Sequence, residues 1–227
     1  MIYSRKKGEK MEQKEILNKI KRYVQEVCKD DSTGHDWWHI KRVYANAMLI
    51  NKKEHANEFL LAIIVLMHDL FDHKFYNGNI AEKIEENLKQ LQVYEYLSKE
   101  DIQNIINSCV NLGFSSNIAK KKELSQEGKI AQDADRLDAI GAIGIARTFA
   151  YGGKKGKLIY DPNNNELVDE KEYNENGSKT SISHFYDKLL KIKDLMNTDT
   201  AKEIAIERNR FLEEFLKEFL DEWNGVK

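Results

Sequence analysis

Apolar residues recur along most of the chain at steps of three and four, the spacing that gathers them on one face of a helix. No stretch keeps the strict alternation that predicts a strand. The segment Glu58 to Phe71 is apolar nearly all round, so we expect it at the centre of the fold. The pattern predicts an all-α protein, a single compact multi-helix bundle, with these helices: about Glu12 to Val27, Asp36 to Lys53, Glu58 to Phe71, Asn79 to Leu91, Ser98 to Leu112, Gly128 to Tyr151, Ser181 to Met196 and Thr200 to Trp223.

Two of the predicted helices open on a capping signature. Ser98 is followed three residues later by Asp101, and Thr200 is followed three residues later by Glu203. In such pairs the first side chain accepts from the backbone N–H of the residue three positions on, and the acidic side chain of that residue accepts from the backbone N–H of the first. We therefore place helix starts at both points.

The pattern also suggests how the chain is organised. Residues 1–11 are basic and unpatterned, which predicts a loose N-terminal arm before one domain over residues 12–227. A long polar loop, residues 152–178, precedes the last two helices and contains Gly152, Gly153 and the sole proline, Pro162. A connection of that length is either a functional flap or disordered.

Composition excludes several classes of partner. The 36 Lys and Arg residues are balanced by 38 Asp and Glu residues, a formal net charge of −2. That balance gives no reason to expect a nucleic-acid polymer or an anionic membrane as partner. The longest apolar stretch, Phe59 to Met67, is too short to span a bilayer, and residues 1–25 lack the apolar core of a secretory signal. The two cysteines, Cys28 and Cys109, form no disulfide framework, so we expect a cytoplasmic protein.

Metal-competent side chains gather at three places on separate predicted helices. They are the pair His35 and His39, the pair His68 and Asp69, and the acidic run Asp133 to Asp138. Burying an unpaired charge costs several kcal/mol, so a cation shared by all three sites would account for them together. Taken singly, His68 also fits a hydrogen-bonded core histidine. The acidic run also fits a solvated face or a set of partners for Arg136.

Three short motifs resemble the H…HD…D signature of the HD-domain metal-dependent phosphohydrolases. They are His39-x-x-Arg42-Val43, His68-Asp69 and Ala134-Asp135-Arg136-Leu137. The long run over residues 127–153 is similar to the bacterial YedJ/YpgQ-like subgroup. The resemblance extends from about Asp31 to Trp223 and implies an HD-domain bundle.

The resemblance implies one divalent cation held by His39, His68, Asp69 and Asp135. Two imidazole nitrogens and two carboxylate oxygens suit Mn²⁺, Fe²⁺, Co²⁺, Ni²⁺ or Zn²⁺ better than Mg²⁺, and we expect manganese first. An octahedral shell would keep two positions for a water and a phosphate oxygen. His35 lies one turn from His39, so it is either a further ligand or a catalytic group that faces the substrate.

Catalytic and substrate-binding residues are predicted around this set. Asp72 lies three residues after Asp69, and related enzymes use an acidic residue at this offset as general acid or base; the alternative is pairing with Lys74. Lys74, Arg136 and Arg147 are candidates to bind phosphate, since their charge and geometry match it. Arg136 would equally serve to fix Asp133 or Asp138.

The implied activity is hydrolysis of a small phosphorylated substrate by a metal-activated water. The subgroup points to nucleoside triphosphates, cleaved to a monophosphate and pyrophosphate. Alternatives are a nucleoside monophosphate phosphatase, a phosphodiesterase, or an HD module that senses nucleotides without turnover.

Aromatic residues step by four along the last predicted helix, at Phe211, Phe215, Phe219 and Trp223. This face is either core or the interface of a homodimer.

Overall fold

The structure, a computed structural model, describes residues 2–29, 36–70, 78–112, 123–164, 168, 172–173 and 176–227, with side chains from Glu12 onward. Every regular element in these residues is an α-helix or a 3-10 helix, which confirms the predicted all-α class. None of the described helices is long and apolar enough to cross a membrane. The chain forms two compact units, residues 1–132 and 133–227.

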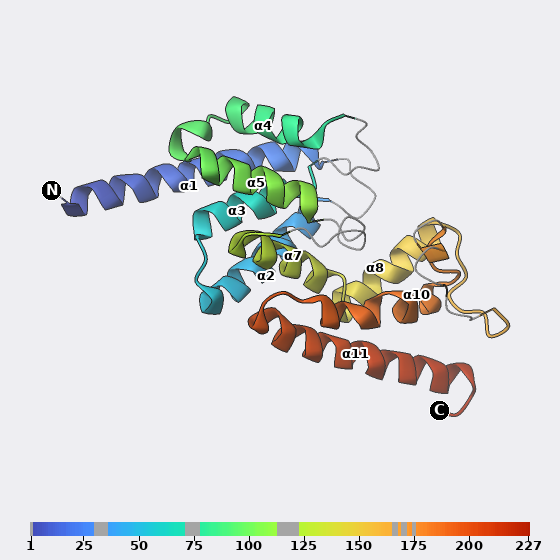
Figure 1. Ribbon diagram of the computed structural model, residues 1–227. Coiled ribbons are helices and arrows are strands. Elements are labelled where there is room, and N and C mark those ends of the chain that lie inside the picture. The colour runs from blue at the N-terminus through green and yellow to red at the C-terminus, as the bar shows by residue number, and fades with distance from the viewer. Residues whose placement is uncertain are drawn as a thin grey trace. The chain divides into compact units, whose positions relative to one another are not determined.

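The first unit is built around helix α3 (Glu58–Met67). This helix packs against α1 (Ile2–Val27), α2 (Trp37–Glu54) and α5 (Lys99–Asn111), as Figure 1 shows. All of its residues from Phe59 to Met67 are buried, because no side of the helix is polar. The central position predicted for this segment is therefore confirmed. Helix α4 (Ile80–Gln90) packs on α5, and the short 3-10 helix η1 (Tyr94–Tyr96) joins them.

Side-chain caps set the helix starts of the first unit. Ser98 accepts from the Asp101 amide while Asp101 accepts from the Ser98 amide, so the predicted capping box of α5 is confirmed. Asn57 caps α3 and Asn79 caps α4: the side-chain oxygen of each accepts hydrogen bonds from backbone N–H groups in the first turn of its helix.

The second unit gathers its helices around α11 (Asp199–Trp223). Helix α11 packs against α8 (Gly141–Lys154) and the 3-10 helix η2 (Leu189–Leu195), and α10 (Ser181–Asp187) packs on both of these (Figure 1). Helix α7 (Gln126–Asp138) is the segment in which the chain passes from the first unit to the second.

Aromatic rings contact one another between these elements, around the buried Phe185. The Phe215 ring lies 5.6 Å from that of Phe185 and 5.8 Å from that of Phe149, and the Phe219 ring lies 6.0 Å from that of Tyr160. Phe215 and Phe219 are half-buried in these contacts, so the core interpretation of this helix face holds for them only in part, and Trp223 is 50% exposed. Phe211, by contrast, is 47% exposed. The homodimer stays a prediction.

The single helix predicted over Gly128 to Tyr151 is wrong. The chain leaves helical geometry at Ile140, whose backbone is extended, and restarts at Gly141 with φ of +73°. A positive φ is reached easily only by glycine, so this residue permits the sharp change of direction between α7 and α8. The hydrophobic pattern carries no sign of the break, because small apolar residues continue through it.

The prediction for the last two helices needs two corrections. Ser181 to Met196 is not one helix, because Lys188 has φ of −135° and separates α10 from η2. Helix α11 is capped by Thr198, whose side chain accepts from the Ala201 amide, and not by the predicted Thr200. Thr200 lies inside the first turn.

The structure also differs from the predictions for the N-terminal arm and the long polar loop. Residues 2–11 belong to α1, whose Arg, Lys, Glu and Met residues are good helix formers. Helix α8 continues through Gly152 and Gly153, so the loop begins later than expected. The loop is tied to α10, since Leu158 and Ile159 accept from the Ser181 and Ile182 amides at 3.0 Å each. Parts of the predicted loop, residues 165–167, 169–171 and 174–175, lie outside the described residues.

Candidate metal centre

Three of the predicted ligands meet inside the first unit. His39 Nε2 lies 3.1 Å from Asp69 Oδ2, and His68 Nε2 lies 3.4 Å from the same oxygen. The centroids of the two imidazole rings are 5.6 Å apart. Two nitrogens and one carboxylate oxygen therefore converge on a common point.

Local structure fixes each imidazole. His39 is in the first turn of α2, where Asp36 caps the helix by accepting from the His39 amide at 2.8 Å. His68 is the C-cap residue of α3, and its Nδ1 lies 2.8 Å from the Val65 carbonyl oxygen. A carbonyl oxygen only accepts, so Nδ1 of His68 carries a proton and donates it to this bond.

This tautomer matters for what the cluster can bind. With the proton on Nδ1, Nε2 of a neutral His68 presents a lone pair towards Asp69 Oδ2. A lone pair and an anionic oxygen repel one another unless a proton or a cation lies between them. A histidine that donates its other ring nitrogen to a backbone carbonyl is also the usual arrangement at metal sites. The geometry therefore fits a divalent cation.

The cluster lies in a region of low exposure. The side chains of His39 and His68 are 1% and 3% exposed, and that of Asp69 is 16% exposed. Nearby, burial raises the pKa of the Cys109 thiol to about 12, and the charge of Asp69 contributes to the same shift. The thiol is therefore uncharged, and the Asp69 carboxylate lies in a poorly solvated place against two buried imidazoles, an arrangement that favours a bound cation.

The acidic run on α7 separates into residues with different surroundings. Asp133 is fully buried and Asp138 is 2% exposed, whereas Asp135 is half-buried. Asp138 Oδ2 accepts from Arg147 Nη1 at 2.7 Å, and Asp133 accepts from Asn197 and Thr198. The interpretation of the whole run as a solvated face is therefore wrong, since two of its carboxylates have internal partners.

Both arginines predicted to bind phosphate make internal contacts. Arg136 Nη1 donates to the Leu195 carbonyl and lies 3.9 Å from Asp133 Oδ1, and burial lowers the pKa of Arg136. Arg147 is paired with Asp138, as noted above. Their assignment to substrate stays a prediction.

Three further candidates, His35, Asp72 and Lys74, lie outside the described residues. Their predicted roles therefore stay predictions as well.

Sequence reasoning missed the hydrogen-bond partners of His68 and Asp133. The Val65 carbonyl carries no side-chain signal, so its bond to His68 is visible only in three dimensions. Asn197 and Thr198, the partners of Asp133, lie more than sixty positions away from it in the chain.

Comparison with known proteins gives consistent similarities. The HD domain family profile matches residues 37–140. The chain is 38% identical over 217 residues to the Bacillus subtilis (strain 168) protein YpgQ, covering 95% of this chain and 98% of that protein. It is also 28% identical over 187 residues to protein L803 of Acanthamoeba polyphaga mimivirus, covering 70% and 75% of the two chains.

Solved structures are similar over nearly the whole chain. An HD-superfamily hydrolase from Bacillus thuringiensis has 38% identity and a TM-score of 0.73, covering 93% of this chain and 98% of that chain. The crystal structure of Bacillus subtilis YpgQ in complex with ADP has 34% identity and a TM-score of 0.70, covering 93% and 100%.

Proposed function

This chain belongs to the HD-domain family, in the group that contains YpgQ, and on that premise we propose that it hydrolyses nucleotides with a divalent metal ion. The proposed reaction converts a nucleoside triphosphate to a monophosphate and pyrophosphate. The observation that carries the proposal is the convergence of His39 Nε2 and His68 Nε2 on Asp69 Oδ2.

The proposed metal ligands are His39, His68, Asp69 and Asp135. The first three supply two nitrogens and one oxygen from the first unit, and the family motif adds the carboxylate of Asp135. Such a mixed set suits Mn²⁺, which we propose as the ion, and also Fe²⁺, Co²⁺, Ni²⁺ or Zn²⁺. When bound, a divalent ion activates water and offsets the charge that develops on a reacting phosphate.

The chain's own residues would then orient the metal ligands and the substrate and transfer protons. The bond from His68 Nδ1 to the Val65 carbonyl leaves Nε2 as the nitrogen with the lone pair in the neutral ring, as a ligand requires. We assign Asp72 as general acid or base, and His35 as a catalytic group facing the substrate. Lys74, Arg136 and Arg147 are proposed to bind phosphate.

A nucleotide is the favoured substrate because Bacillus subtilis YpgQ has been crystallised with ADP. A diphosphate nucleotide contains the anhydride chemistry that the proposed reaction requires. A nucleoside monophosphate phosphatase or a phosphodiesterase would carry the same ligands, so the products decide between them. Cytoplasmic location also stays a proposal, supported by two buried free thiols, Cys28 and Cys109.

The test is product analysis on the purified protein with Mn²⁺ and a panel of nucleoside and deoxynucleoside mono-, di- and triphosphates. Release of pyrophosphate supports the proposal, and orthophosphate alone supports the phosphatase alternative. Asp69→Asn is expected to lose activity. The matched control is Asp194→Asn, an aspartate with a 70% exposed side chain, which is expected to keep it. If no phosphate bond is cleaved with any of several metals while nucleotide still binds, the protein is a sensor and the enzyme proposal fails.

A further inference from the structure

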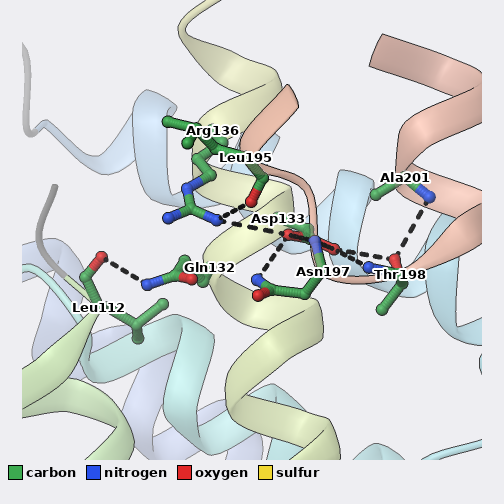
Figure 2. Close-up of polar contacts among 8 residues, drawn as sticks. All are labelled: Leu112, Gln132, Asp133, Arg136, Leu195, Asn197, Thr198 and Ala201. Atoms are coloured by element: carbon green, nitrogen blue, oxygen red, sulfur yellow. Dashed lines mark hydrogen bonds and ion pairs between the residues drawn. The ribbon is translucent and has the colours of Figure 1, made fainter. Parts of the chain in front are cut away.

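Asp133 holds an unusually large number of hydrogen bonds for one side chain. Its Oδ1 accepts from the Asn197 amide and the Asn197 Nδ2, both at 2.8 Å. Its Oδ2 accepts from the Thr198 amide and the Thr198 hydroxyl, also both at 2.8 Å, and lies 3.1 Å from the Asn197 amide (Figure 2). Two consecutive residues thus surround a fully buried carboxylate.

Hydrogen-bond donors face both oxygens of the Asp133 carboxylate. Burial raises the pKa of Asp133, and the hydrogen bonds from Asn197 and Thr198 act in the opposite direction. All the donors are neutral, and Arg136 Nη1 at 3.9 Å supplies a positive charge on the same side. Because N–H and O–H groups point at both oxygens, replacing either oxygen with an amide nitrogen would set donor against donor.

The contacts join helix α7 to the start of α11. The Thr198 hydroxyl donates to Asp133 and also accepts from the Ala201 amide, so one side chain both contacts α7 and caps α11. One turn further along α7, Arg136 Nη1 donates to the Leu195 carbonyl (Figure 2). We call this set the Asp133 clamp: Asp133, Arg136, Leu195, Asn197 and Thr198.

Asp135 lies within the turn of α7 that the clamp holds. Residues two positions apart on an α-helix are separated by about 200° around its axis. Asp135 is therefore directed to the other side of α7 from Asp133, and in keeping with this it is half-buried while Asp133 is fully buried. Fixing the rotation and height of this turn fixes where the Asp135 carboxylate lies.

We propose that the Asp133 clamp is a positioning device for the metal ligand Asp135. Asp133 touches neither metal nor substrate in this account; it acts through Asp135 by holding the turn of α7 against the Leu195–Thr198 segment. The inference rests on the proposed function, because that function makes Asp135 a ligand. It adds a role for a buried aspartate that the ligand set does not include.

The test measures both metal affinity and stability, because a purely structural role of Asp133 would change stability and leave metal affinity unchanged. Mn²⁺ affinity is measured by calorimetric titration at a temperature at which every variant is folded by circular dichroism. Asp133→Asn is expected to weaken Mn²⁺ binding at least tenfold. Leu212→Ala, which removes a fully buried side chain of α11 outside the clamp, is the matched control. It is expected to lower the melting temperature while keeping wild-type affinity.

A second pair of variants guards against a misfolded Asp133→Asn protein. Thr198→Val removes the hydroxyl from the clamp and is expected to weaken Mn²⁺ binding, whereas Thr198→Ser keeps the hydroxyl and is expected to restore it. Combining Thr198→Val with Asp133→Asn is expected to weaken binding by less than the product of the two separate effects, because both act through one contact.

The outcomes separate the clamp from the function on which it rests. Wild-type protein that takes up no divalent ion refutes the proposed function and the clamp's role with it. Wild-type protein that binds Mn²⁺, with Asp133→Asn and Thr198→Val binding equally well, refutes the clamp alone. The same holds if Leu212→Ala weakens binding as much as Asp133→Asn does.

Discussion

Replacing Gly141 with alanine tests the break between α7 and α8, the feature that divides the motif-bearing run into two helices. Gly141 has φ of +73°, a conformation that costs a residue with a Cβ roughly 1–2 kcal/mol. An added Cβ would also lie 3.1 Å from Arg208 Cγ and 3.2 Å from Arg208 Cβ. Both distances are shorter than ordinary contacts, so the Arg208 side chain has to move.

That movement has an energetic consequence of its own. Arg208 Nη1 donates to the Leu137 carbonyl in the last turn of α7, and weakening this bond costs about 1 kcal/mol. Alanine also lowers the conformational entropy of the unfolded chain, which offsets roughly 0.5–1 kcal/mol of this loss of stability. We therefore expect Gly141→Ala to lower the free energy of unfolding by about 1.5 kcal/mol.

The assay is urea unfolding followed by circular dichroism, with Gly153→Ala as the matched control. Gly153 lies in α8 with no atom within 4 Å of an added Cβ, so the same substitution there is expected to raise stability by roughly 0.5 kcal/mol. The urea concentration at the unfolding midpoint is expected to fall for Gly141→Ala and to rise for Gly153→Ala. If Gly141→Ala is neutral or stabilising, Gly141 does not hold a positive φ and the described break is wrong.

Three further predictions follow from single side chains. Burial, with two nearby lysines, lowers the pKa of His184 from 6.5 to about 3. Between those pH values the unfolded state binds more protons than the folded state, so the free energy of unfolding falls as the pH drops below 6.5. At about pH 5 the loss is up to about 2 kcal/mol. In urea titrations His184→Gln is expected to remove this pH-dependent loss. Asp36→Ala removes the cap that accepts from the His39 amide and is expected to cost about 1 kcal/mol of stability, measured the same way. Burial raises the pKa of Cys109 to about 12, so in a Cys28→Ser background a thiol reagent at about pH 8 is expected to label the protein only after unfolding.

Each of these has a control and a contrary outcome. The exposed His55, changed to Asn, should leave the pH dependence of stability unchanged; an equal effect at both histidines would contradict the assignment to His184. Asp36→Asn keeps a capping oxygen and should retain most of the stability that Asp36→Ala loses. Rapid labelling of folded protein would show that Cys109 is accessible and not buried.

Local sequence determined much of the fold. Phe59 to Met67 is apolar on all sides, so only a central position buries it. Ser98 and Asp101 form the capping box of α5 from residues within one turn. Features that depend on distant partners escaped the pattern. Near the break at Gly141, Arg208 donates to the Leu137 carbonyl, and the Thr198 hydroxyl that caps α11 donates to Asp133, so both features involve segments far apart in the chain.

The candidate site divides in the same way. His39, His68 and Asp69 were identified from motifs, since imidazoles and a carboxylate on buried helices need a common partner. The Val65 bond that sets the tautomer of His68 could not be predicted, because it involves a backbone carbonyl. The contacts of Asp133 could not be predicted either, because Asp135 and Asp138 in the same run are the same residue type. Only the contacts of each carboxylate tell them apart.

The central claim is that this chain holds a divalent metal ion at His39, His68 and Asp69. The most direct measurement is metal analysis of protein purified without chelator, together with His68→Ala and the exposed-histidine variant His55→Asn. We predict about one transition-metal ion per chain in the wild type and in His55→Asn, and loss of the ion in His68→Ala. Wild-type protein that contains no metal and takes up no added Mn²⁺, or His68→Ala that keeps a full complement, would contradict the account.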